Sequence, residues 1–183
     1  MGIKLSGKLD EIHKTLMKEA ERVETLTIRA LAYLGEQCVR RIRDRPGEKS
    51  WFDQSGNLRS SVGYIISHNG NIVSSYGFDS SMGKAAHTKQ VEYVTKDGKK
   101  VSFTARVKAG GQEGAKAGKD LAEELIKRYS NDYVLVIVAG MNYAEYVEAM
   151  DNKDVLASTE LWATDKIPQM LEKLKRQIAK SVS

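Results

Sequence analysis

The stretch over residues 8–43 constrains the fold most strongly, because its apolar residues recur at spacings of three and four. These residues are Leu9, Ile12, Leu16, Ala20, Val23, Leu26, Ala30, Leu31, Leu34, Cys38 and Ile42. The spacing predicts one amphipathic helix with charged residues on its other sides. At 1.5 Å per residue the helix would be about 50 Å long. It could therefore extend past a single globular core and pack on a neighbouring subunit.

Two antiparallel hairpins are predicted after this helix. The first has strands over residues 62–67 and 71–78, joined by Asn69-Gly70, because both residues tolerate the positive φ of a tight turn. The second has strands over residues 91–95 and 101–107, with Asp97-Gly98 at its turn. Its later strand alternates in polarity, as a strand with one covered face does.

Further elements are predicted towards the C-terminus. A helix is expected over residues 120–128, then a continuous apolar strand over residues 132–139 with a central position covered on both faces. A helix over residues 143–150 would follow, with Asn142 and Glu145 at capping-box spacing. A last helix would be capped by Ser158 or Thr159 and would be kinked or divided at Pro168.

The pattern predicts an α+β fold in a single domain over residues 1–183. The long N-terminal helix and the C-terminal helix would pack on a small, mainly antiparallel sheet. Residues 79–119 would form a variable excursion that projects from the body as a basic β-hairpin. Four glycines near its end predict mobile hinges. They are Gly110, Gly111, Gly114 and Gly118.

The positive charge of the chain is concentrated in residues 89–119. This segment has eight basic and three acidic residues, which accounts for the whole net charge of +5. A localised positive field indicates an acidic protein surface, a nucleic acid or a DNA-filled channel as partner. The candidate contacts are Lys96, Lys99, Lys100, Arg106 and Lys108.

Two interpretations of the basic hairpin stay open. Its lysines could form a solvated edge that prevents strand-to-strand aggregation. They could instead contact phosphate or an acidic protein face. Tyr93 and Phe103 could stack on bases, although packing of the two rings across the hairpin is the favoured interpretation.

Residues that could carry chemistry are scarce. The chain has one cysteine and three histidines. Cys38 lies on the apolar stripe of the first helix, so we expect a buried and unreactive thiol. None of the histidines has a partner at zinc-ligand spacing, and no phosphate-loop motif occurs. We expect no catalytic residue, no metal and no cofactor. No apolar run approaches the ~20 residues of a membrane helix.

Two motifs resemble those of a known family. Residues 53–62, DQSGNLRSSV, resemble the (T/S)GNLRxS(I/V) element of the tail-component proteins of long-tailed bacteriophages, which are also described as tail-completion or head–tail joining proteins. Residues 143–148, YAEYVE, are similar to the YAxYVE segment of the same family. The matching residues are Ser55, Gly56, Asn57, Leu58, Arg59, Tyr143, Ala144, Tyr146, Val147 and Glu148.

The chain also departs from the family pattern. The family often continues after YVE with an aromatic–glycine pair and an Arg-Pro-Phe-like element, whereas this chain continues with AMDNKDVL over residues 149–156. The divergence falls on an expected contact loop, and the basic excursion is larger than usual.

The resemblance implies a structural virion protein of the phage neck or tail with no enzymatic activity. Its subunits would form a homo-oligomeric ring, which closes when the rotation between neighbours closes. Partners would be virion proteins on the portal or adaptor side and on the tail-tube side, with non-specific contact to packaged DNA. The protein would reside in the host cytoplasm during assembly. Leu58, Tyr143 and Tyr146 would be buried scaffold residues. The alternative is a nucleic-acid-binding module that acts through the hairpin of residues 89–119.

Overall fold

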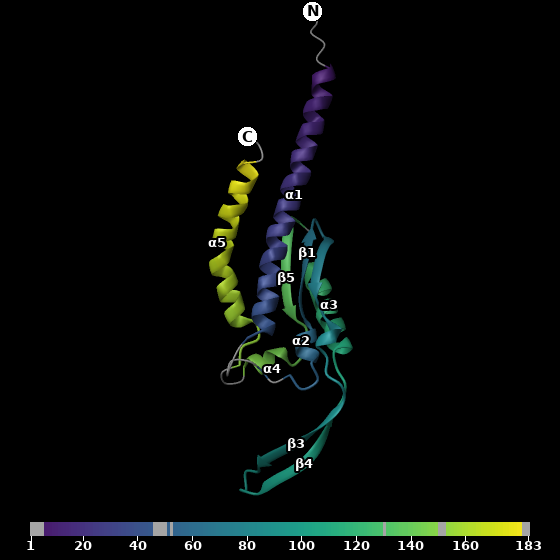
Figure 1. The fold of residues 1–183 in the computed structure, drawn as a ribbon, viewed down its shortest axis with the longest axis vertical. Helices are drawn as coiled ribbons and strands as arrows, with labels where there is room; N and C mark the ends of the chain where they lie inside the picture. The colour runs from purple at the N-terminus through teal and green to yellow at the C-terminus, as the bar shows by residue number, and fades with distance from the viewer. Residues whose placement is uncertain (1–5, 46–50, 52, 130, 150–152, 181–183) are drawn as a thin grey trace, which may run out of the picture.

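The protein has the expected α+β architecture. The computed structural model describes residues 6–45, 51, 53–129, 131–149 and 153–180. A three-stranded sheet lies between helix α1 (Ser6–Arg43) on one face and helix α3 (Gln112–Ile126) on the other. A separate hairpin of β3 (His87–Val94) and β4 (Lys100–Val107) projects from the end of the body opposite the N-terminus (Figure 1).

The sheet has the order β2-β1-β5, and every neighbouring pair is antiparallel. Its strands are β1 (Val62–His68), β2 (Asn71–Gly77) and β5 (Tyr133–Ala139). The central strand is β1, whereas β5 was predicted to be central and is an edge strand. That prediction was wrong about position but right about coverage, because β5 packs on both α1 and α3.

Alternation along β1 divides the core into two layers. Tyr64 and Ile66 pack towards α1, and Ile65 packs towards α3. All three side chains are at most 2% exposed. Gly35 lets α1 approach the sheet closely, since a Cβ at this position would lie 2.7 Å from the ring of Tyr64.

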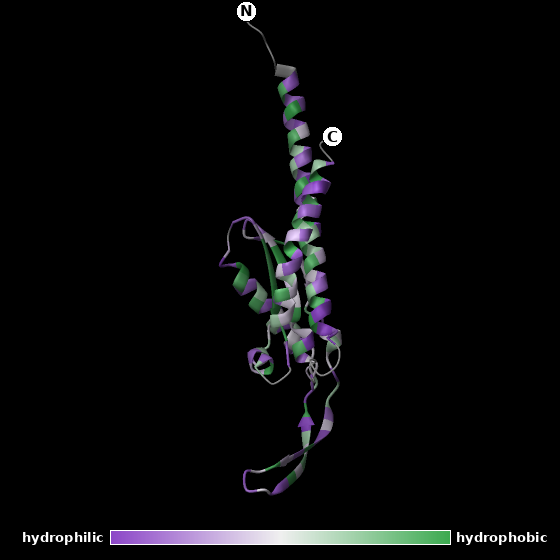
Figure 2. Ribbon diagram, turned by 90° about the vertical axis from the view of Figure 1, so that its left-hand side faces the viewer, coloured by the Kyte–Doolittle hydropathy of each residue, from purple (hydrophilic) through white to green (hydrophobic). Residues whose placement is uncertain are grey.

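Helix α1 is longer than the sheet that it covers. Its C-terminal half buries Val39 and Ile42 in the core, while its N-terminal half extends past the body (Figure 1). Figure 2 shows hydrophobic residues recurring along that extension. Cys38 lies in the covered half with 0% of its surface exposed, and burial raises the pKa of its thiol to about 11 although the charge of Arg41 opposes the shift. The prediction of a buried thiol is confirmed, and its raised pKa disfavours the reactive thiolate form.

Helix α3 begins at Gln112, well before the predicted start at Asp120. The glycines before and within it are packing positions rather than mobile hinges. A Cβ at Gly114 would lie 2.1 Å from the carbonyl oxygen of Asn57, and one at Gly118 would lie 2.1 Å from that of Ser61. These glycines let the helix backbone contact the chain that precedes β1.

Both predicted hairpin turns are confirmed. Asn69 and Gly70 have φ values of 51° and 78°, and Gly98 has 76°. The positive values fit the turn geometry that favours these residue types. In the second hairpin, β3 and β4 pair from His87 opposite Val107 to Val94 opposite Lys100.

Two helices complete the body, α4 (Ala144–Glu148) and α5 (Ala157–Ala179). Pro168 lies inside α5 and does not divide it. The predicted caps were wrong, because no side-chain cap is formed by Asn142 on α4 or by Ser158 or Thr159 on α5. The predicted last residue of α4, Met150, lies outside the described residues.

The start of α5 is instead held by acids that precede it. The carboxylate of Glu148 accepts hydrogen bonds from the backbone N–H groups of Leu156 and Ala157, both at 2.8 Å. Asp154 accepts one from Ser158 N–H at 3.2 Å and forms an ion pair with Arg45 at the end of α1. Burial opposes ionisation of Asp154, but the bonds from Ser158 and the charge of Arg45 outweigh it and hold the pKa of the carboxyl below its ordinary value.

Within the described ranges, no helix is sufficiently long and apolar to cross a membrane.

Candidate functional site

The first sequence motif forms a junction through helix α2 (Asn57–Ser60). Asp53, which is 6% exposed, holds this short helix by accepting hydrogen bonds from Gly56 N–H at 2.9 Å and from Arg59 N–H at 2.7 Å. From the sequence alone, Ser55 is the residue type expected to cap this turn, but its hydroxyl accepts only a longer hydrogen bond of 3.3 Å from Asn57 N–H. A carboxylate that accepts N–H bonds at a helix start satisfies donors that have no partner within the helix.

Asn57 ties this junction to the base of the basic hairpin. Its side-chain oxygen accepts a hydrogen bond from Gly111 N–H at 2.6 Å, and its amide nitrogen donates to Glu113 at 3.2 Å. Both partners belong to the start of α3, directly after the hairpin returns to the body. Lys84, on the outgoing side, donates to the carbonyl oxygen of Asp53 at 2.6 Å. The two ends of the hairpin are therefore anchored on the first motif.

Arg59 connects the same junction to the end of α1. Its guanidinium donates to the carbonyl oxygen of Arg43 and lies 5.0 Å from the ring centroid of Trp51. Arg43 returns the contact by donating to the carbonyl oxygen of Arg59 at 3.1 Å and to that of Val62 at 2.7 Å. Burial lowers the pKa of Arg43, and the nearby carboxylates of Asp79 and Asp44 oppose that effect. These bonds fix α1, α2 and the start of β1 relative to one another.

The second motif meets the first one in a shallow cleft. Leu58 lines this cleft together with Tyr143, Tyr146 and Val147, although the two motifs are far apart in the sequence. Ala144 is buried and packs in the main core, and Glu148 holds the start of α5 as described above. The structure thus brings both motifs together at the end of the body from which the hairpin projects.

The prediction that both tyrosines are buried was wrong. Leu58 is 1% exposed as predicted, but Tyr143 is 36% exposed and Tyr146 is 68% exposed. Burial still raises the pKa of Tyr143, with a further contribution from the charge of Asp53 and an opposing hydrogen bond with Ser55. Helix α4 is only five residues long, so one face covers the core through Ala144 and the tyrosines lie on the cleft side.

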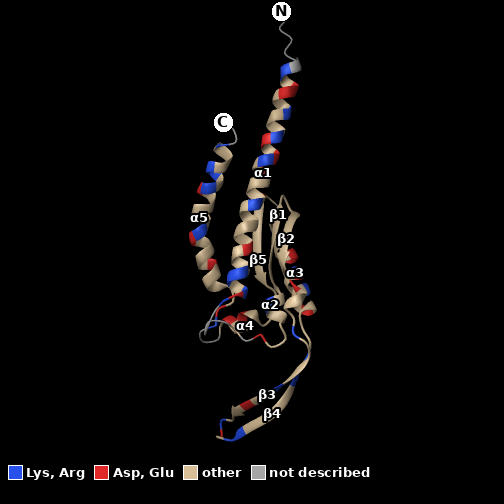
Figure 3. Ribbon diagram, viewed as in Figure 1, with Lys and Arg blue, Asp and Glu red and all other residues tan. Residues whose placement is uncertain are grey.

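The candidate basic contacts lie on the projecting hairpin and directly after it. Lys96, Lys99 and Lys100 are exposed around the turn, while Arg106 and Lys108 lie at the base of the hairpin. Figure 3 shows the blue residues at the hairpin tip, away from the body. The positive segment also extends into α3, where Lys116 and Lys119 are exposed. The sequence pattern had assigned these two lysines to the hairpin.

The aromatic residues of the hairpin pack across it. The rings of Tyr93 and Phe103 meet edge to face with centroids 6.5 Å apart. This confirms the favoured interpretation, and such pairs stabilise a two-stranded sheet. The rings nevertheless remain 51% and 47% exposed.

Among the described residues, no group of His, Cys, Asp and Glu side chains has an arrangement suited to a metal ion. Comparisons of the chain with protein-family models, with curated proteins and with solved structures found no match.

Replacing Asp53 tests which residue holds α2. We expect Asp53→Ala to lower the free energy of unfolding by about 1.5–3 kcal/mol, because two backbone N–H groups lose a charged acceptor. Ser55→Ala should change it by less than about 0.5 kcal/mol. Chemical denaturation monitored by circular dichroism measures both values, with the exposed Gln54→Ala as control. An equal or larger loss for Ser55→Ala would contradict this assignment.

Proposed function

We propose that the protein is a structural, non-enzymatic component of a bacteriophage neck or tail. In this proposal its subunits form an oligomeric ring in the virion that joins the head to the tail or completes the tail. The observation that carries the proposal is the meeting of the two family-like motifs in one cleft, which Leu58 lines together with Tyr143 and Tyr146. Two segments that matched the family motifs only by chance would not be expected to meet in the folded protein.

The shape of the molecule supports a role in assembly. A long helix extends from one end of the body, and a basic hairpin extends from the other (Figures 1 and 3). The extending part of the helix carries exposed apolar residues. Both are surfaces through which a subunit can contact copies of itself and other proteins. In the proposed ring, the neighbours along the axis are portal- or adaptor-side and tail-tube-side virion proteins.

The hairpin supplies the electrostatic part of this proposal. Its turn places Lys96, Lys99 and Lys100 together on a stalk that is anchored at both ends through Asn57 and Lys84. A positive tip of this kind is attracted to an acidic protein face or to DNA phosphates. The anchored base fixes where the tip is presented.

The proposal predicts closed rings of one size. Native mass spectrometry and negative-stain electron microscopy of the purified chain, alone and mixed with portal-side and tail-side proteins of the same genome, should detect them. Heterologous contacts between identical subunits give rings when the rotation closes. A chain that stays monomeric at every concentration and in every mixture would contradict the proposal. Neighbouring genes for portal, capsid and tail-tube proteins would support it independently.

A second candidate function is nucleic-acid binding through the hairpin, favoured by the exposed basic turn. We expect Lys96→Glu, Lys99→Glu and Lys100→Glu together to abolish binding of a DNA duplex measured by fluorescence anisotropy at low salt. In the unsubstituted chain, the logarithm of the affinity should fall linearly with the logarithm of salt concentration, because each phosphate contact releases counterions. The charge-matched control reverses Lys116, Lys119 and Lys127 on and after α3.

This second candidate fails if the unsubstituted chain does not bind DNA at low salt. It also fails if the control triple variant loses as much affinity as the hairpin variant, since the charge alone and not the hairpin would then explain binding. Neither result bears on ring formation.

A further inference from the structure

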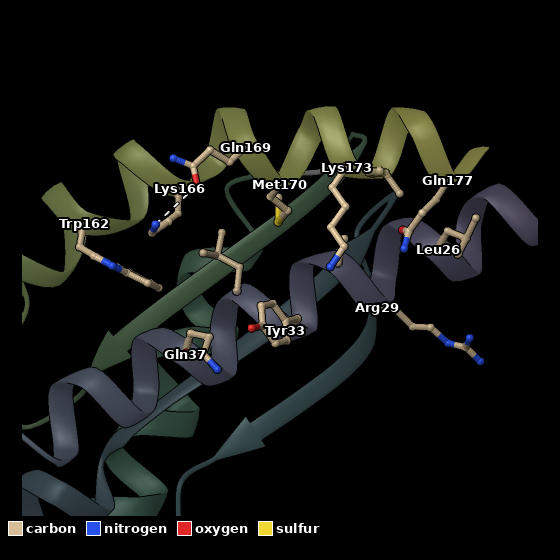
Figure 4. Close-up of a pocket in the computed structure, with 13 residues that line it drawn as sticks. Leu26, Arg29, Tyr33, Gln37, Trp162, Lys166, Gln169, Met170, Lys173 and Gln177 are labelled. Carbon is tan, nitrogen blue, oxygen red and sulfur yellow. Dashed lines mark hydrogen bonds between the residues drawn. The ribbon is translucent and has the colours of Figure 1, made fainter. Parts of the chain in front are cut away.

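An apolar groove runs between α1 and α5 on the outside of the body (Figure 4). It has a volume of about 500 Å³. Side chains of Leu26, Ala30 and Leu34 line it from α1, and Met170 and Leu174 line it from α5. Two antiparallel helices with an open apolar seam between them form a site that a third helix can fill.

The same stripe of α1 that lines the groove continues beyond the body. Leu9, Ile12 and Leu16 follow the spacing of three and four that leads through Val23 to Leu26. These three residues are 62%, 55% and 64% exposed. Apolar residues in such a row are covered in most folded proteins, and a helical extension without tertiary packing is only marginally stable in water.

We propose that the apolar stripe of one copy, from the exposed Leu9 to the half-buried Val23, docks into the α1–α5 groove of a second copy. This inference rests on the self-association in the proposed function and identifies the surfaces that carry it. A heterologous contact of this kind covers the stripe of one copy and the groove of the next, and every copy carries both surfaces.

The lengths of the two surfaces agree. The stripe spans the helical segment from Leu9 to Val23, which is about 21 Å at 1.5 Å per residue. The groove follows α5 from Trp162 to Gln177, which is about 22 Å by the same rise. The stripe therefore matches the groove in length.

The charges at the two surfaces also agree. The residues that line the groove include the basic Arg29, Lys166 and Lys173 and no acid. The N-terminal half of α1 carries the half-buried Glu19 within the apolar stripe, between Leu16 and Val23. Docking brings this carboxylate next to the basic residues at the rim of the groove. Two basic grooves that faced each other would repel.

This contact also constrains how a ring is built. Rotation about a ring axis does not shift one copy along that axis relative to the next. The stripe lies near the N-terminal end of α1 and the groove lies farther along the same helix. The two can meet only if α1 is inclined to the ring axis, so that successive copies overlap along their long helices.

Cross-linking between two separately tagged chains tests the contact. Leu16 is at the centre of the stripe and Met170 is at the centre of the groove, so the two meet whether the docked helix runs parallel or antiparallel to α5. One chain carries Leu16→Cys, the other carries Met170→Cys, and a short bismaleimide is added to the mixed oligomer. The unsubstituted chain, whose Cys38 is fully buried, is the control for background.

The expected result is a cross-link between the Leu16→Cys chain and the Met170→Cys chain, and none in the control. An oligomer in which only Leu16→Cys chains cross-link to each other would overturn this inference in favour of a bundle of N-terminal halves, while leaving the proposed ring intact. An oligomer with no cross-link at either position would also overturn it. A chain that never oligomerises would overturn both proposals.

Discussion

Helix α1 is far longer than the strands that it covers, and this mismatch determines what the rest of the molecule can do. The helix has 38 residues, about 57 Å, whereas β1 has seven residues, about 23 Å. Burial of Val39 and Ile42 against β1 fixes the C-terminal half of α1 in the core. Most of the N-terminal half lies beyond that core, so its exposed Leu9, Ile12 and Leu16 are available for contacts between molecules.

The end of α1 is also where the other functional features are assembled. Arg43 and Arg59 exchange hydrogen bonds with each other's backbone, which joins the end of the helix to α2. Asn57 then links α2 to α3 and the base of the hairpin. The base of the hairpin is therefore connected to α1 through a short series of bonded and packed groups. In a subunit that contacts neighbours through both the N-terminal half of α1 and the hairpin, such a junction would fix the orientation of these two surfaces relative to each other.

Features set by neighbours in the sequence could be predicted. The spacing of apolar residues identified α1, and Asn69-Gly70 and Asp97-Gly98 identified both turns, because helix periodicity and turn dihedrals are local properties. The hydrophobicity of β5 showed that both of its faces are covered. It could not show that β5 is an edge strand, since strand order depends on pairing with distant segments.

The wrong predictions have a common physical cause, which is that each feature depends on contacts that the local residue pattern does not show. Glycine serves mobile linkers and close helix packing equally well, and only the position of the Asn57 carbonyl shows that Gly114 is a packing residue. Asp53 and Glu148 act as caps from outside the helices that they hold, so patterns within each helix did not identify them. Tyr143 and Tyr146 resembled buried scaffold residues, yet the brevity of α4 leaves them at a cleft.

Hydrogen–deuterium exchange measured along α1 at low and high protein concentration distinguishes a free N-terminal half from a docked one. Backbone amides of residues 8–22 should exchange rapidly in dilute monomer and become protected on oligomerisation. Amides of residues 34–42 should be protected at both concentrations, because the sheet covers them in each copy. Protection of residues 8–22 in the monomer, or continued rapid exchange of this segment in the oligomer, would contradict the account.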